Sequence, residues 1–210
     1  MKPERLQKIK GVVARRQSDL TVVLENVRDQ HNVGAVIRSC DSIGIQEIFV
    51  LYTEPALQAD SIVVGKRTSA GSRRWVDVHY YTDAARCFAH VKSRYQRVLG
   101  THLDEQATSL YRLDLRQPTA FLFGNERDGL SAEALSYANG NFLIPQVGMA
   151  TSLNISVACA VTLYETYRQR EMAGRYAQQE AFSDAQQQLF EDYLQRHKQS
   201  GSHFVIKKTA

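Results

Sequence analysis

Polar side chains gather in three segments of the sequence, and each segment directly follows a short apolar run. The segments span residues 26–32, 124–131 and 146–154. If the apolar runs are strands of one parallel sheet, their carboxyl ends share an edge, which is where ligands bind in such sheets. The side chains available to a ligand at or near that edge are Asn32, Arg38, Asn125, Glu126, Arg127, Ser152 and Asn154.

Arg38 allows two interpretations. It lies on the edge of an amphipathic helical pattern and is followed by Ser39 and Asp41, so it could be a surface arginine paired with an acid. It could also contact an anion or a hydroxyl group beside the start of that helix, because a guanidinium offers a planar fork of donors that suits phosphate. The local pattern leaves both open.

Several other chemistries find no support in the sequence. No Gly-x-Gly-x-x-Gly or Walker phosphate loop follows a strand, and no Gly-x-Ser-x-Gly elbow supports a serine hydrolase. Glu126 alone stands out as an acid, whereas glycoside hydrolysis needs two. The three cysteines are far apart, so we expect no metal site and no disulfide framework; Cys40 and Cys159 fit buried helix faces.

The elements that must position these loops alternate between strand and helix. Apolar and β-branched runs predict strands over residues 21–25, 45–51, 75–80, 97–102, 119–124 and 142–144. Helical spacing predicts helices over 3–17, from Asn32 as N-cap to Gly44, over 83–95 behind a Thr82 cap, after Ser131, and from Ser152 or Asn154 to Arg170. The sequence therefore predicts an α/β fold with a mainly parallel sheet flanked by helices.

Composition and charge indicate a soluble protein with a polyanionic partner. The 210 residues carry a net charge of +4, with cations clustered in residues 1–16, at Lys66, Arg67, Arg73 and Arg74, and at Lys207 and Lys208. Clustered cations favour nucleic acid. No apolar run is long enough for a membrane span, no secretory signal is visible, and free thiols suit the cytoplasm. A Gln-rich stretch, 177–199, predicts a C-terminal helix or helix pair, and we expect 201–210 to fray.

The three polar segments resemble the three motifs of the SPOUT class of RNA methyltransferases, and within it the TrmH family of ribose 2′-O-methyltransferases. The matching stretches are Asn32 to Arg38, Phe123 to Ser131, and Ile144 to Ala158. The likeness runs from about residue 5 to residue 176 and includes the basic run at Arg15 and Arg16. It implies a basic N-terminal extension over 1–19, a methyltransferase domain over 20–172 with a deep trefoil knot in its C-terminal part, and a helical extension over 173–210.

The resemblance also implies a cofactor, a partner and residue roles. Family members are homodimers whose knot loops hold S-adenosylmethionine, here with contacts at Thr101, Gly124, Ile144 and Leu153. By position, Arg38 is the catalytic arginine and Asn32 positions it, while Glu126, Ser152 and Asn154 complete the site. A guanidinium is effectively always protonated, so we expect Arg38 to bind phosphate or stabilise an alkoxide rather than act as a base.

The resemblance points to tRNA as the substrate, with the D-loop guanosine as its target nucleotide. Arg15, Arg16, Lys66, Arg67, Arg73 and Arg74 are then the predicted RNA contacts. Two departures leave the target open: the third motif reads Met149-Ala150-Thr151 where Val-Gln is usual before the serine, and the second has Arg127-Asp128 where a lysine is more usual. The alternatives are a methyltransferase acting on an rRNA guanosine or on the tRNA anticodon loop, and a non-catalytic RNA-binding protein.

Overall fold

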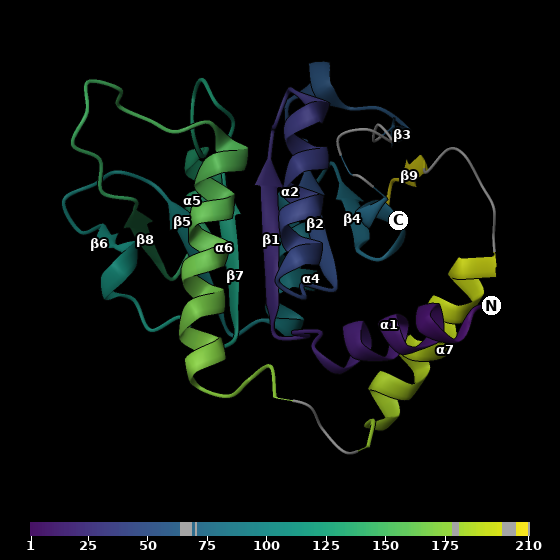
Figure 1. Ribbon diagram of the computed structural model, residues 1–210. Helices are drawn as coiled ribbons and strands as arrows, with labels where there is room; N and C mark the ends of the chain where they lie inside the picture. Colours follow the sequence, from purple (N-terminus) through teal and green to yellow (C-terminus); the bar gives the residue numbers. More distant parts are fainter. Residues whose placement is uncertain (64–68, 70, 178–180, 199–204, 210) are drawn as a thin grey trace.

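A computed structural model describes residues 1–63, 69, 71–177, 181–198 and 205–209. Its helices and strands alternate along the chain (Figure 1). In order they are α1 (Pro3–Ala14), β1 (Leu20–Glu25), α2 (Gln30–Ser42), β2 (Glu47–Leu51), β3 (Ser61–Val63), β4 (Asp77–Tyr81), α4 (Ala84–Arg94), β5 (Arg97–Thr101), β6 (Thr108–Ser109), β7 (Thr119–Phe123), α5 (Ala132–Ser136), β8 (Gly140–Leu143), α6 (Ile155–Met172), α7 (Asp184–Lys198) and β9 (Val205–Lys207).

Seven of the strands form one sheet in the order β4-β2-β1-β7-β5-β8-β6, and every pairing in it is parallel. The predicted α/β class with a mainly parallel sheet is confirmed. Because the strands run the same way, the loops that leave β1, β5, β7 and β8 all emerge at one edge. This edge carries the three polar segments.

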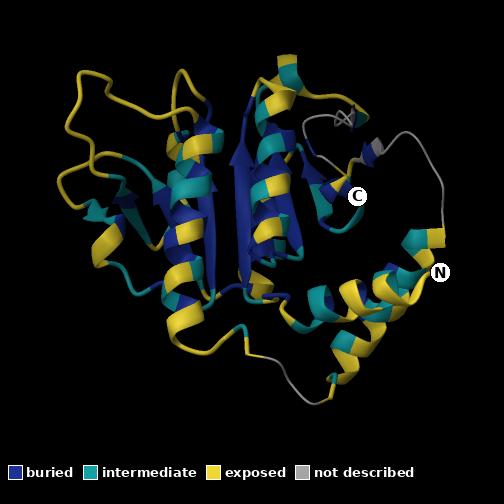
Figure 2. Cartoon of the chain, in the orientation of Figure 1, coloured by how far each residue is buried: buried dark blue, intermediate teal, exposed yellow. Residues whose placement is uncertain are grey.

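Helices cover both faces of the sheet, so the central strands β1, β2 and β7 are buried on both sides (Figure 2). Alternate residues of one strand therefore face different helices. Val22 and Leu24 pack with α2 and α6, while Val23 packs with α4 and α5. The near-continuous apolar runs of β1 and β7 follow from this double burial.

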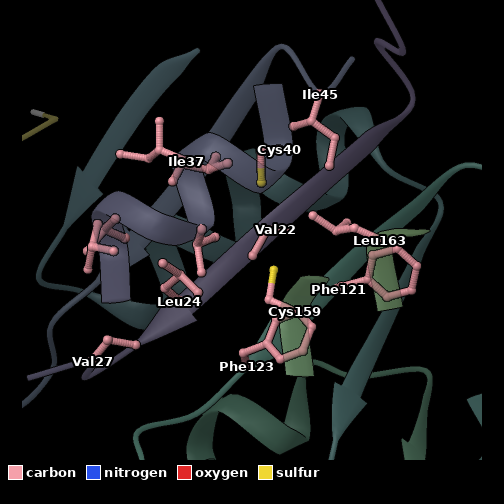
Figure 3. Packing of buried hydrophobic residues seen from close by; sticks show 14 of the residues in the cluster. Val22, Leu24, Val27, Ile37, Cys40, Ile45, Phe121, Phe123, Cys159 and Leu163 are labelled. Carbon is pink, nitrogen blue, oxygen red and sulfur yellow. The ribbon is translucent and has the colours of Figure 1, made fainter. Parts of the chain in front are cut away.

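Two of the three cysteines meet in the layer between the sheet and the helices α2 and α6. Cys40 of α2 and Cys159 of α6 point toward each other beside Val22 (Figure 3). Both are buried, and burial raises the pKa of the Cys40 thiol well above its ordinary value. These are packing residues, as predicted, and the raised pKa of Cys40 keeps its thiol protonated, which does not suit a nucleophile.

Helix caps explain where the site helices begin. The Asp29 carboxylate accepts from the His31 N–H at the start of α2, so the prediction of Asn32 as N-cap was wrong. Likewise Asp83, not Thr82, caps α4. The predicted caps Ser131 of α5 and Asn154 of α6 are confirmed. Moving the α2 cap three residues earlier matters, because it releases the Asn32 side chain for other contacts.

The N-terminal and C-terminal helices pack against each other beside the sheet (Figure 1). Ile9 and Val13 of α1 meet Leu189 and Tyr193 of α7 in a small apolar cluster. Arg16 ties this pair to the body. Its guanidinium donates to the Tyr193 hydroxyl, the Asp41 carboxylate and the backbone oxygens of Ile45 and Trp75, at 2.7–2.9 Å.

Near the end of the chain, the described residues 205–209 are paired with the body of the protein. Residues 205–207 form β9, which pairs antiparallel with β3, and the Thr209 N–H donates to the Tyr80 oxygen of β4. The expectation that this end frays was therefore wrong for the described part of it. No helix in the described ranges has the length and apolar character needed to cross a membrane.

Candidate active site

A cavity of about 690 Å³ opens at the carboxyl ends of β5, β7 and β8. Its wall includes Thr101, Gly124, Ile144 and Leu153, which are the four residues predicted to hold the cofactor. Glu126 and Ser152 from the predicted catalytic set also line it. The second and third sequence segments thus contribute to one concave site of a size typical for small-molecule ligands.

The second segment forms a tight, closed loop. The backbones of Asn125 and Gly129 exchange two hydrogen bonds of 3.2 Å, and the Asn125 side-chain oxygen accepts from the N–H groups of Arg127 and Asp128. A Cβ on Gly124 would lie 2.1 Å from the carbonyl carbon of Gly129. Only glycine therefore permits this closure, which fixes the position from which Glu126 projects.

Hydrogen bonds between side chains join all three segments. The Asn32 side-chain nitrogen donates to Glu126 Oε1 at 2.5 Å, and the Asn154 side-chain nitrogen donates to Asn32 Oδ1 at 3.3 Å. Asn154 also accepts from the N–H and the hydroxyl of Ser156, which fixes it at the start of α6. The prediction that the three polar segments meet in space is confirmed for these residues.

Arg38 lies elsewhere on α2. It is exposed, does not line the cavity, and has no hydrogen-bond or ion-pair partner within the described ranges. Six residues separate it from Asn32, which on an α-helix is a rotation of roughly 120° away from the Asn32 side. A single chain therefore lines the cavity with Glu126 and Ser152, links Asn32 and Asn154 to Glu126 by hydrogen bonds, and leaves Arg38 outside this group.

The family is decided by a sequence comparison over most of the chain. Residues 19–164 match the model of the SpoU rRNA Methylase family, and this range spans β1, the site loops and the first half of α6. The chain belongs to the SpoU methylase family.

Two relatives of this SpoU-family chain match it over more than nine tenths of its length, and a third matches a shorter part. It is 39% identical over 192 residues to the tRNA (guanosine(18)-2′-O)-methyltransferase of Thermus thermophilus, covering 91% of this chain and 96% of the relative. The solved TrmH/SpoU tRNA modifying enzyme of A. aeolicus superposes with a TM-score of 0.81 at 28% identity, covering 95% and 98% of the two chains. The SpoU methyltransferase AviRb of Streptomyces viridochromogenes, solved in complex with AdoMet, gives a TM-score of 0.63 at 27% identity over 76% of this chain and 64% of AviRb.

The predicted RNA contacts of the SpoU-family chain differ in how far their side chains are exposed. Arg15 is exposed and Arg74 is half-buried, so both remain available. The prediction for Arg16 needs correction, because its side chain is 2% exposed and its donors serve the protein itself. Arg73 is also buried and does not offer a free surface charge. Lys66 and Arg67 lie outside the described residues.

Sequence reasoning missed other parts of the site. His102 lines the cavity although no local pattern marks it, whereas Gln146 and Met149 line it from within the predicted third segment. Glu25 was read as an ordinary strand residue, yet it is a buried carboxylate whose pKa is raised by burial. An acid inside an otherwise apolar strand was the available signal.

Proposed function

We propose that this chain transfers the methyl group of S-adenosylmethionine to a ribose 2′-hydroxyl of tRNA, with the D-loop guanosine as the target. The observation that carries the proposal is the hydrogen-bonded chain Glu126–Asn32–Asn154, which starts at the cavity wall with Glu126 and joins all three segments. The T. thermophilus relative, whose name gives guanosine 18 of tRNA, supports the target. We therefore rank an rRNA guanosine or an anticodon-loop nucleotide below it.

The residues of the cavity fit a nucleoside cofactor with a charged sulfur. Apolar side chains such as Phe142 and Ile155 provide walls for a flat base, while the strand-end backbone at Thr101 and Ile144 offers hydrogen-bonding groups. The AdoMet complex of AviRb supports the same choice. When bound, the cofactor supplies an electrophilic methyl group on a sulfonium.

The protein's own side chains have the task of orienting and stabilising the reacting hydroxyl. Asn32 and Asn154 present amide groups that are already held by hydrogen bonds, so little order is lost when a ribose binds. The Arg38 guanidinium remains protonated and stabilises the negative charge that develops on the 2′-oxygen, or binds the neighbouring phosphate. Ser152 offers a further hydroxyl at the cavity wall.

In a homodimer, Arg38 of one chain would lie near the cavity of the other chain. Val157, Tyr164 and Met172 of α6 are exposed by 47%, 54% and 74%, and Met149 of the third loop is fully exposed. Such a row of apolar side chains beside α2 suits a second copy of the chain, whose Arg38 would then approach the site. Mixing an Arg38→Ala chain with a Glu126→Ala chain should restore part of the activity, because one of the two mixed sites is then intact.

The two extensions bind tRNA, while the domain of residues 20–172 carries out catalysis. The extensions 1–19 and 173–210 pack together through α1 and α7, and α1 exposes Lys2, Lys8 and Lys10 beside Arg15. We assign tRNA backbone binding to this basic surface together with Arg74, Lys66 and Arg67. The trefoil knot, which the A. aeolicus likeness supports, is proposed for the region that carries the second and third loops. A cytoplasmic location follows from the tRNA substrate.

The deciding experiment is a methyl-transfer assay with labelled cofactor on defined tRNA transcripts, followed by mapping of the modified position. We expect label at the D-loop guanosine and none on a transcript that carries 2′-O-methylguanosine there. Label found only in the anticodon loop or only in rRNA would show that the target is that nucleotide and not the D-loop guanosine. Calorimetry without detectable S-adenosylmethionine binding would instead favour a non-catalytic RNA-binding protein.

A further inference from the structure

Glu25 joins the central strand to the second site loop. It is the last residue of β1 and is 1% exposed. Its carboxylate accepts two hydrogen bonds from Ser131, one from the N–H at 2.9 Å and one from the hydroxyl at 2.5 Å. The two residues are 106 positions apart in sequence, so this contact exists only in the folded protein.

Both ends of the contact are firmly held. On the Glu25 side, the next residue, Asn26, donates its N–H to the Leu51 oxygen of β2, and its side-chain oxygen accepts from Thr53 and Glu54. On the other side, the Ser131 hydroxyl accepts from the Ala134 N–H and thereby caps α5. The carboxylate therefore bridges a rigid strand end and a helix start, at the point where the loop of residues 124–131 ends.

Packing alone does not explain a carboxylate at this position. Burial is the main cause that raises the Glu25 pKa, and the nearby acids Glu133 and Glu54 raise it further. The structure shows no positively charged partner for it among the described residues. A buried acid paired only with a serine costs stability, and such costs are typical of residues kept for function.

We propose that Glu25 is a positioning residue, which sets the second site loop against Asn32 and the cavity wall by holding Ser131. The inference rests on the proposed methyl transfer. It explains how Glu126, at the tip of a loop that is closed on itself by Asn125 and Gly129, is also fixed relative to the sheet. Without the Ser131 anchor the closed loop could tilt as a unit and carry Glu126 away from Asn32.

The test compares Glu25→Ala, Glu25→Gln, Ser131→Ala and the double variant Glu25→Ala/Ser131→Ala. Glu25→Gln keeps an oxygen that can accept from the Ser131 N–H. The matched control is Glu47→Ala, since Glu47 is a buried carboxylate at the other end of a neighbouring strand, hydrogen-bonded to Tyr95 and Arg94 and remote from the cavity. For each variant, KM for S-adenosylmethionine, kcat and the thermal midpoint are measured.

We expect Glu25→Ala to raise KM for the cofactor about tenfold and to lower kcat, without lowering the thermal midpoint. Glu25→Gln should restore KM to within about threefold of the unmodified protein. Ser131→Ala should have a smaller effect, because the backbone donor remains, and the double variant should match Glu25→Ala. Glu47→Ala should lower the thermal midpoint and leave KM unchanged.

Three results would overturn the proposal: unchanged kinetics in Glu25→Ala, a Glu25→Gln variant as impaired as Glu25→Ala, or losses that multiply in the double variant. A fall in kcat that only tracks a lower folded fraction, as in the control, would assign Glu25 a purely structural role. If the unmodified protein shows no methyl transfer, the proposed function fails separately. Calorimetric binding of S-adenosylmethionine to the same variants then still tests the positioning.

Discussion

The side chains of Asn32 and Glu126 are joined by a hydrogen bond of 2.5 Å between residues 94 positions apart. Asn32 belongs to the first turn of α2, whereas Glu126 projects from the loop after β7. The contact forms because β1 and β7 are neighbours in the sheet, which places the loops that follow them side by side. It is the closest link between the first two site segments.

This hydrogen bond should make the two residues act as a unit in catalysis. We expect Asn32→Ala and Glu126→Ala each to lower kcat/KM by about 10²-fold, since each removes an orienting group. The double variant should be no worse than the poorer single variant, because the second change removes an interaction already lost. Steady-state kinetics of the four proteins measure this coupling, and independent, multiplying losses would contradict it.

Arg38 should be essential for methyl transfer and dispensable for folding. Its side chain is exposed, so Arg38→Ala should leave the thermal midpoint unchanged while reducing kcat by at least about 10²-fold. Arg86 of α4 is an exposed arginine on the opposite face of the sheet, and Arg86→Ala is the matched control. Near-normal turnover in Arg38→Ala would remove the residue from the proposed mechanism.

Arg15 and Arg16 are neighbours with opposite expected roles. Arg16→Ala should lower the free energy of unfolding by about 3 kcal/mol, because it leaves the buried acceptors around Asp41 and Tyr193 without a donor. Arg15→Ala should leave stability unchanged but weaken tRNA binding, and should reduce the slope of log K against log salt by roughly one. Urea unfolding and salt-dependent binding assays separate the two, and a reversal of these effects would refute the assignment.

Glu25 and Glu47 should contribute to the pH dependence of stability with opposite signs. Burial raises the pKa of the Glu25 carboxyl, so as pH falls this group is protonated in the folded protein before it is protonated in the unfolded chain. The stability that it contributes is therefore present at low pH and is lost as pH rises through the folded-state pKa. At Glu47 burial alone would raise the pKa, but the hydrogen bonds from His79 and Tyr95 together with the charge of Arg94 outweigh it and lower the pKa. Its contribution to stability is therefore present above about pH 4.5 and is lost as pH falls through the folded-state pKa.

In urea unfolding between pH 4 and 8, Glu25→Gln should therefore gain stability relative to the unmodified protein toward neutral pH. Glu47→Gln should lose stability at neutral pH, and its deficit should shrink in acid. Parallel curves for the two variants would show that the two carboxylates do not differ in this way.

The sheet and the site loops could be predicted because their signals are local. The apolar runs of β1, β2 and β7 are buried on both faces, and such runs mark strands without any knowledge of their partners. Ser131 and Asn154 were recognisable as caps because their side chains serve backbone groups only a few residues away. Grouping the loops at one edge then follows from parallel pairing.

Features that depend on distant partners could not be predicted. Arg16 lies in a run of cations typical of an exposed surface, and its burial requires Tyr193 from the far end of the chain. Asn32 is a good cap by residue type, but Asp29 reaches the helix start first, and the competing partner Glu126 is not visible locally. The pairing of β9 with β3 likewise depends on two very short segments meeting.

The packing of α1 on α7 has a consequence for synthesis of the protein. The hydrogen bond from Arg16 to Tyr193 spans 177 residues, so the first helix leaves the ribosome long before its partner exists. At roughly 5–20 residues per second, this delay lasts about 10–35 s, during which the apolar stripe around Ile9 and Val13 is uncovered. The nascent chain therefore exposes the apolar face of α1 until α7 has been synthesised, and truncation before residue 184 should yield products that aggregate or recruit chaperones.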